Sequence, residues 1–184
     1  MYVKLKMMDL QHFTISRDLM LLEPRIWKGQ RCTLVYERDR TYVVLASVKR
    51  VISRACASYG TSLQTSTLLS KEITKGTKKL PIGLGTKQPI ILIPTSSPSN
   101  GHTQWVVYDA IQNYSPALYN ECHIQFVNGD TFTLRLSYHS LRTQLSHAHA
   151  ISKYFQALSV EQISHLQSSL FFGEVSMDAL LPVD

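Results

Sequence analysis

The stretch "CHIQFVNGDTFTLRLSYHSLRTQLSHAHAISKYFQAL", residues 122–158, joins a β-hairpin pattern to a long helical pattern. Asn128-Gly129 favours a turn because both residues tolerate a positive φ. A two-residue turn would place Phe132 and Ile124 on opposite faces, whereas a three-residue loop with a left-handed Gly129 would place them on one face. We expect the three-residue loop, although a sheet buried on both faces also accepts the shorter turn. The apolar face of the expected hairpin comprises Ile124, Phe126, Phe132 and Leu134.

A long amphipathic helix is expected directly after this hairpin, over residues 137–158. Ser137 is a suitable N-cap, and the apolar residues that follow recur at steps of three and four. These residues are Tyr138, Leu141, Leu145, Ala148, Ile151, Phe155 and Leu158. Further along, "VEQISHLQSSLFF" (160–172) predicts a second, short helix with Ser159 as its cap.

Further strand patterns lie upstream of the hairpin. Residues 33–36 and 42–45 are rich in β-branched and aromatic side chains and flank the charged "ERDR", which predicts another hairpin. "QPIILIPT" predicts a short strand that either lies at a sheet edge, because of Pro89, or starts at Ile90, and "WVVYD" predicts the next strand. The chain is therefore expected to have an α+β fold, with a β-rich core of hairpins, one basic helix and a longer C-terminal amphipathic helix.

The basic helix is expected at "SVKRVISRACASY", residues 47–59, with its first serine as the N-cap and Gly60 at its end. Its apolar residues recur at helical spacing, and Lys49, Arg50 and Arg54 lie away from that stripe. Such a face is either solvated or contacts phosphates. The sequence of this helix alone leaves both interpretations open.

Residues 61–77 are rich in Ser and Thr and then become basic, which is typical of a mobile loop. Loops of this kind also bind phosphates, because Lys side chains and free backbone N–H groups both reach a duplex backbone. The cations that would make such contacts are Lys71, Lys75, Lys78 and Lys79.

The 184-residue chain carries a net charge of +6, and this charge is unevenly distributed. Residues 1–79 hold 15 Lys or Arg and 6 Asp or Glu, whereas residues 80–184 hold 4 and 7. A basic first half favours an acidic partner such as nucleic acid or an anionic surface. The hydrophobic content of 44% is enough for one globular core, so we expect a single domain over residues 1–184.

The sequence gives little support to an enzyme. It contains no nucleophile elbow, no phosphate-binding glycine loop and no metal-binding His-Glu-x-x-His helix, so neither a cofactor nor a metal is expected. His147 and His149 diverge on a helix and are poorly placed to share a metal. A hydrolase would need Ser137, His139 and a carboxylate such as Asp130 in one pocket.

The cysteines and the hydropathy indicate where the protein resides. Cys32, Cys56 and Cys122 are an odd number at wide spacing, which fits neither a disulfide framework nor a zinc module. No apolar run is long enough to span a bilayer. We therefore expect a cytoplasmic protein with no membrane partner.

The order of several short motifs resembles the ComK family of competence transcription factors. In chain order these motifs are "SRACASYG", "LPIGL", "IILIPTSS", Trp105, "VNGDTFTLRLSYHS" and a helix ending in "KYF". The best matches are Cys56-x-x-x-Gly60 and the Asn128-Gly129 hairpin that leads into Ser137-Tyr138-x-Ser140. The resemblance covers roughly residues 15–155, with residues 1–14 and 159–184 as divergent terminal segments.

This resemblance implies a sequence-specific DNA-binding activator of genes for DNA uptake. It also implies binding to A/T-rich boxes as a homo-oligomer, association with the nucleoid and control by an adaptor that delivers the protein to a protease. The narrow minor groove of A/T-rich DNA attracts Arg and Lys. The DNA contacts are then expected from Lys49, Arg50 and Arg54 of the basic helix together with Lys71, Lys75, Lys78 and Lys79.

One departure from the family pattern leaves DNA binding open. After the position of Gly60, members of this family usually carry an aromatic residue and then a Gly-Arg-Lys-like group. This chain has Leu63 and the polar residues 64–67 instead. Either Lys71–Lys79 supply the missing phosphate contacts, or the chain is a diverged paralogue with weak or no DNA binding that acts through protein partners.

The helical and hairpin registers together predict a set of buried side chains. This set comprises Val51, Ile52, Ala55, Phe126, Phe132, Leu134, Leu145 and Phe155.

Overall fold

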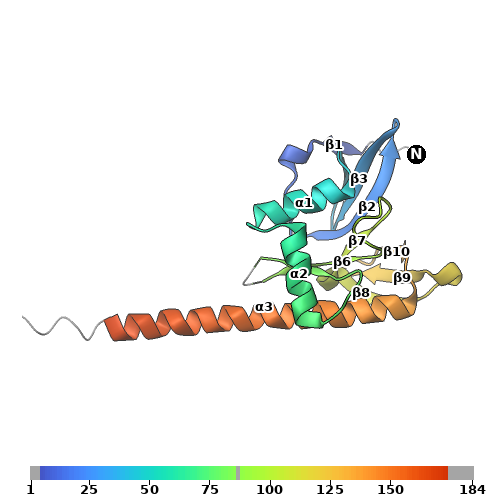
Figure 1. The fold of residues 1–184 in the computed structure, drawn as a ribbon. Coiled ribbons are helices and arrows are strands. Elements are labelled where there is room, and N and C mark those ends of the chain that lie inside the picture. The colour runs from blue at the N-terminus through green and yellow to red at the C-terminus, as the bar shows by residue number, and fades with distance from the viewer. Residues whose placement is uncertain (1–4, 86–87, 174–184) are drawn as a thin grey trace, which may run out of the picture.

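Three α-helices and two β-sheets form the α+β fold expected from the sequence (Figure 1). The computed structural model describes residues 5–85 and 88–173, with side chains as far as residue 159. The strands are β1 Lys6–Met8, β2 Leu19–Trp27, β3 Gln30–Glu37, β4 Thr41–Val44, β5 Ile82–Leu84, β6 Ile90–Pro94, β7 Trp105–Val107, β8 Ile111–Pro116, β9 Cys122–Phe126 and β10 Thr131–Leu134. The helices are α1 Val48–Ser58, α2 Leu63–Thr74 and α3 Tyr138–Gly173, and short 3₁₀ turns are η1 Leu10–His12, η2 Tyr108–Ala110 and η3 Leu118–Asn120.

The larger sheet has seven strands in the order β1-β4-β3-β2-β7-β6-β5. Only the β1–β4 pair is parallel, and the hairpin predicted around "ERDR" is confirmed as β3–β4. Strand β6 lies inside the sheet, so the expectation of an edge strand is wrong. The alternative start at Ile90 is confirmed, because Pro89 precedes the first paired residue and withdraws no donor from the ladder.

The smaller sheet, in the order β10-β9-β8, confirms the three-residue hairpin loop. Phe132 lies opposite Ile124, and the N–H of Phe126 donates to the carbonyl of Asp130 at 2.8 Å. Gly129 has a φ of 90°, the left-handed conformation that the loop requires. The apolar face predicted for this hairpin is therefore correct.

Helix α3 begins as predicted but continues further. The Oγ of Ser137 accepts the N–H of Ser140 at 3.1 Å, which confirms the cap. The helix then runs without a break to Gly173 and extends past the sheets (Figure 1), so the prediction of a separate second helix is wrong. Ser159 does not start a helix, because its hydroxyl donates to the carbonyl of Phe155 at 3.0 Å inside α3.

The expectation of a mobile loop at residues 61–77 is wrong, because most of this segment forms α2. The Oγ of Ser62 accepts the N–H of Thr65 at 3.0 Å and caps the helix. Three hydroxyls inside the helix donate to carbonyls four residues earlier, which satisfies the polar side chains that suggested a loop. They belong to Thr67, Ser70 and Thr74.

The core lies between the larger sheet, the three helices and the inner face of the smaller sheet. Six of the eight side chains predicted to be buried are buried, and Phe132 and Leu145 are partly exposed but pack against the core. Within residues 5–85 and 88–173, no helix combines the length and apolar character that a membrane span needs.

Candidate nucleic-acid interface

The predicted cations of α1 lie on its exposed face, opposite the residues buried against the sheet. Arg54 already has a hydrogen-bond partner, because its Nη2 donates to the carbonyl of Gln11 in η1 at 3.2 Å. Lys49 and Arg50 form no ion pair or hydrogen bond with any described residue. They are therefore free to contact a partner.

The predicted cations near α2 are exposed at its C-terminal end. Lys71 lies in the last turn, and Lys75 follows it with a left-handed φ of 55° and a long ion pair to Glu72 at 3.9 Å. Lys78 and Lys79 precede β5. This end of α2 lies next to α3, whereas Lys49 and Arg50 lie at the start of α1 beside the larger sheet (Figure 1).

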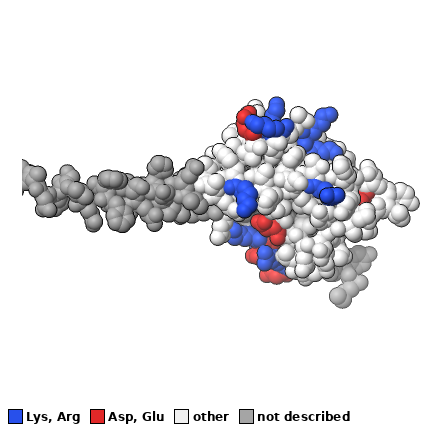
Figure 2. All heavy atoms as spheres, turned by 90° about the horizontal axis from the view of Figure 1, so that it is seen from below, with Lys and Arg blue, Asp and Glu red and all other residues white. Residues whose placement is uncertain are grey.

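The structure therefore separates the predicted cations into two groups. The face seen from below in Figure 2 also shows Lys and Arg in small separate groups, with acidic side chains beside some of them. No continuous basic surface is present on that face. Other cations, which no sequence pattern linked to each other, line a pocket elsewhere on the protein.

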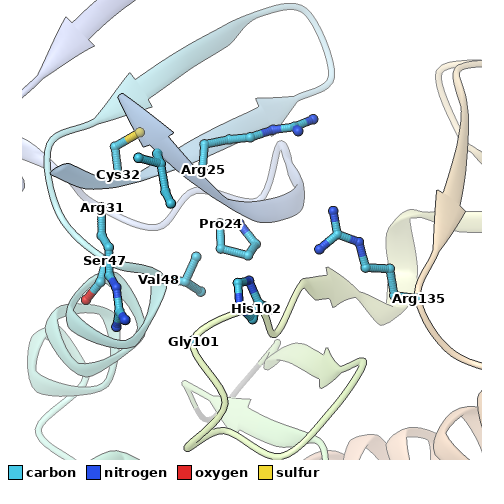
Figure 3. A pocket seen from close by; sticks show the side chains of 10 residues that line it. Pro24, Arg25, Arg31, Cys32, Ser47, Val48, Gly101, His102 and Arg135 are labelled. Carbon is cyan, nitrogen blue, oxygen red and sulfur yellow. The ribbon is translucent and has the colours of Figure 1, made fainter. Parts of the chain in front are cut away.

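A pocket of about 380 Å³ lies where the β2–β3 hairpin, the start of α1, the β6–β7 loop and the end of β10 meet. Figure 3 shows Arg31 beside Ser47 on one side, Arg135 reaching in from the other and His102 between them. The lining residues are Pro24, Arg25, Ile26, Arg31, Cys32, Ser47, Val48, Gly101, His102 and Arg135. Two arginines from one hairpin, Arg25 and Arg31, and one from a distant segment, Arg135, thus line one hollow.

A buried hydrogen-bond network holds two of these segments in place. The carboxylate of Glu23 accepts from Arg25 Nη2 at 2.8 Å, Tyr36 Oη at 3.1 Å and Gln104 Nε2 at 3.4 Å. The Oε1 of Gln104 in turn accepts the backbone N–H of Arg135 at 3.1 Å. Because Glu23 and Gln104 are both buried, this network fixes where Arg25 and the backbone of Arg135 lie.

Two of the three arginines are not ion-paired. The side chains of Arg31 and Arg135 are exposed and form no ion pair or hydrogen bond within the described part of the chain. The guanidinium of Arg31 lies beside Gly101. His102, also exposed, adds ring nitrogens between the two arginines.

The pocket continues onto α1. A smaller adjoining hollow of about 90 Å³ is lined by Arg31, Ser47, Val48 and Lys49, among others. Ser47 occupies the N-cap position as predicted, but its hydroxyl makes no capping hydrogen bond. The first turn of α1 therefore contributes a cation and the positive end of its dipole to the same surface. We call Arg25, Arg31, Lys49, His102 and Arg135 the arginine surface.

The chemistry of the arginine surface suits phosphate. Guanidinium groups donate paired hydrogen bonds to phosphate oxygens, and Lys adds a point charge. Burial raises the pKa of the Cys32 thiol at the pocket wall, and the smaller opposing effect of Arg25 does not reverse this shift. Cys32 therefore remains a neutral part of the wall at physiological pH.

The residues considered for a hydrolase form hydrogen bonds with other partners. The Oγ of Ser137 donates to Ser140, and the carboxylate of Asp130 accepts from Asn128, so neither bonds to His139. Within residues 5–85 and 88–173, no three His, Cys, Asp or Glu residues are grouped to hold a metal ion.

The family of the chain follows from comparison with known proteins. A family model described as ComK protein matches residues 10–158. The chain belongs to the ComK family. The competence transcription factor of Bacillus subtilis (strain 168) is 24% identical over 136 residues, which cover 74% of this chain and 71% of that protein. No solved structure matches the chain significantly. The resemblance found in the sequence motifs is thereby confirmed.

Proposed function

We propose that this protein is a competence transcription factor that binds double-stranded DNA through the arginine surface. Two observations support the proposal. The chain belongs to the ComK family, in which the Bacillus subtilis relative is a competence transcription factor. Arg31 and Arg135, without partners in the described chain, reach one pocket from opposite sides. The second observation carries the proposal, because it concerns the residues of this chain.

The phosphate backbone of DNA supplies most of the affinity in this proposal. Arg31, Arg135 and Lys49 contact phosphates, and Arg50 extends the contact along α1. Arg54 contributes less, since its guanidinium already binds the carbonyl of Gln11.

The cations at the end of α2 form a second, separate phosphate contact in this proposal. They are Lys71, Lys75, Lys78 and Lys79. The exposure of these four side chains supports a phosphate contact. Their distance from the start of α1 in Figure 1 means that they touch a different part of the DNA, or the DNA bound by another copy.

The finer features of the function follow the family resemblance. The protein acts as an activator of DNA-uptake genes and prefers A/T-rich boxes, whose narrow minor groove concentrates negative potential. It works as a homo-oligomer in the cytoplasm, associates with the nucleoid when bound to DNA, and is limited by an adaptor that delivers it to a protease.

A diverged paralogue that acts through protein partners is the second candidate. The observation in its favour is α2, where the family's cationic group is replaced by a Ser/Thr-rich helix with an exposed Leu68. Such a protein would keep the fold and bind an active relative instead of DNA.

A binding titration decides between the two candidates. The full chain is added to labelled A/T-rich and mixed-sequence duplexes, and fluorescence anisotropy is recorded from about 50 to about 200 mM salt. A DNA-binding factor gives a log affinity that falls linearly with log salt and a preference for the A/T-rich duplex. Absence of binding to both duplexes at the lowest salt would favour the paralogue.

A further inference from the structure

The β2–β3 hairpin carries two large apolar side chains at its tip. Ile26 is 72% exposed and Trp27 is 52% exposed, although both come from a chain with a well-filled core. Because the two residues are consecutive on β2, their side chains lie on opposite faces of the ribbon, and Ile26 lines the pocket whereas Trp27 does not. The proposed function, as stated so far, leaves these two side chains without a role.

The tip is a two-stranded ribbon that projects beyond the sheet. Strand β2 pairs with β7 only at Leu21 and Leu22, and β3 pairs with β4 only from Thr33 onward. The outer residues of the hairpin therefore pair only with each other, and the ribbon stands out from the sheet in Figure 1.

The turn at the end of this ribbon is well defined. Lys28 and Gly29 have φ values of 47° and 76°, which suit a two-residue turn matched to the strand twist. The turn residues therefore favour the hairpin conformation that presents Trp27 at the tip.

The charges around the tip identify the class of partner. No Asp or Glu occurs between Pro24 and Cys32, and although Arg25 is paired with Glu23, Lys28 and Arg31 have no ion pair within the described chain. Two copies of this hairpin packed by two-fold symmetry would bring these cations together.

The area of the tip also disfavours a second copy. A tryptophan buries about 150–250 Å², and a stable protein interface needs about 800 Å² per partner. A nucleic acid fits both features, because its phosphates are anionic and its bases offer flat apolar surfaces to the exposed side chains.

We propose that Trp27, at the end of the ribbon, inserts against the DNA bases while the arginine surface holds the flanking phosphates. This inference rests on the proposed function, because it names the part of the DNA that the hairpin reaches. Apolar wedges of this kind partly unstack a base step, and cations beside them hold the backbone. The A/T-rich duplex favours insertion, because its TA steps unstack easily.

Tryptophan fluorescence tests the insertion directly. The chain has 2 tryptophans, and Trp105 is only 2% exposed, so acrylamide quenches mainly Trp27 in the free protein. Insertion predicts that saturating A/T-rich duplex protects Trp27 from acrylamide, whereas heparin, which offers anionic charge without bases, does not. The Trp27→Phe variant identifies the quenchable signal.

Binding measurements on variants provide the second readout. Trp27→Ala should weaken duplex binding roughly 5- to 150-fold, the range for lost base stacking. The slope of log affinity against log salt should not change, because no phosphate contact is lost. Ile26→Ala, on the other face of β2, should weaken binding less than Trp27→Ala, and the matched control is Leu118→Ala, which truncates a 78% exposed side chain on η3.

Three outcomes would overturn the insertion. Duplex binding with Trp27 still fully quenchable would reject insertion but leave DNA binding intact. Absence of binding to any duplex would reject the proposed function and the insertion together. Protection of Trp27 that rises with protein concentration without DNA would show that the hairpin packs against a second copy instead.

Discussion

Replacing Arg31 and Arg135 together by Gln tests whether the arginine surface contacts phosphate. Both side chains are exposed and without partners in the described chain, so their loss should change the free energy of unfolding by less than about 0.5 kcal/mol. Each phosphate contact on duplex DNA releases about 0.9 counterion. The slope of log affinity against log salt should therefore become shallower by up to about 1.8.

The affinity of this double variant should also fall steeply at low salt. A hydrogen bond to a charged group contributes about 1.5–3 kcal/mol, so two lost contacts predict at least a hundredfold weaker binding. Anisotropy titrations of one A/T-rich duplex at several salt concentrations measure the slope and the affinity together. Urea unfolding of the same sample checks that the fold is intact.

A matched variant at the other basic site makes the result specific. Lys78→Gln with Lys79→Gln removes the same charge at the end of α2. If only this variant flattens the salt slope, then the arginine surface does not bind DNA and our reasoning is refuted. The Arg50→Ala, Arg54→Ala double variant should flatten the slope by about 1 or less, because Arg54 already donates to the backbone carbonyl of Gln11 in η1.

Three further predictions concern the fold. Ser62→Ala should destabilise the protein by about 1 kcal/mol in urea unfolding because it removes a capping hydrogen bond, whereas Ser47→Ala, which removes none, should cost less. Gly83→Ala should cost about 1–3 kcal/mol, because the added methyl group would overlap the ring of Phe155 on α3. Burial and the Glu37 charge raise the pKa of Tyr42, so the unfolded chain loses this proton first and stability should fall as the pH rises above about 10. The Tyr42→Phe variant should show a weaker fall in the same alkaline titration.

The elements that the sequence predicted well are those fixed by local chemistry. The Asn128-Gly129 loop sets the register of β9 and β10 within a few residues, and Ser137 caps α3 through the N–H of Ser140. A turn residue or a cap acts on its own neighbours, so the sequence alone carries the information.

The missed helix α2 shows where composition misleads. Its Ser and Thr content suggested a loop, because hydroxyls compete with backbone hydrogen bonds in irregular structure. In the folded chain these hydroxyls bond back to the helix, and Leu63, Leu69 and Ile73 pack against the core. The Ser62 cap and the spacing of these three apolar residues are the signals from which this helix could have been predicted.

The arginine surface was missed for a different reason. Arg25 and Arg31 lie on one hairpin, His102 comes from a loop, and Arg135 precedes α3, so no sequence window contains them together. Only the strand order, which places β2 beside β7, brings these segments to one pocket. The acid-free stretch from Pro24 to Cys32 was the one local signal.

Glu23 connects the core of the protein to its candidate interface. A buried carboxylate is stable only with several donors, and here Arg25, Tyr36 and Gln104 supply them. Burial raises the pKa of the Tyr36 hydroxyl, and the Glu23 charge raises it further, so this donor keeps its proton. Because Gln104 also accepts the backbone N–H of Arg135, one carboxylate links the segments that carry Arg25 and Arg135. The backbone positions of these two arginines are therefore set by the packed interior before any partner binds.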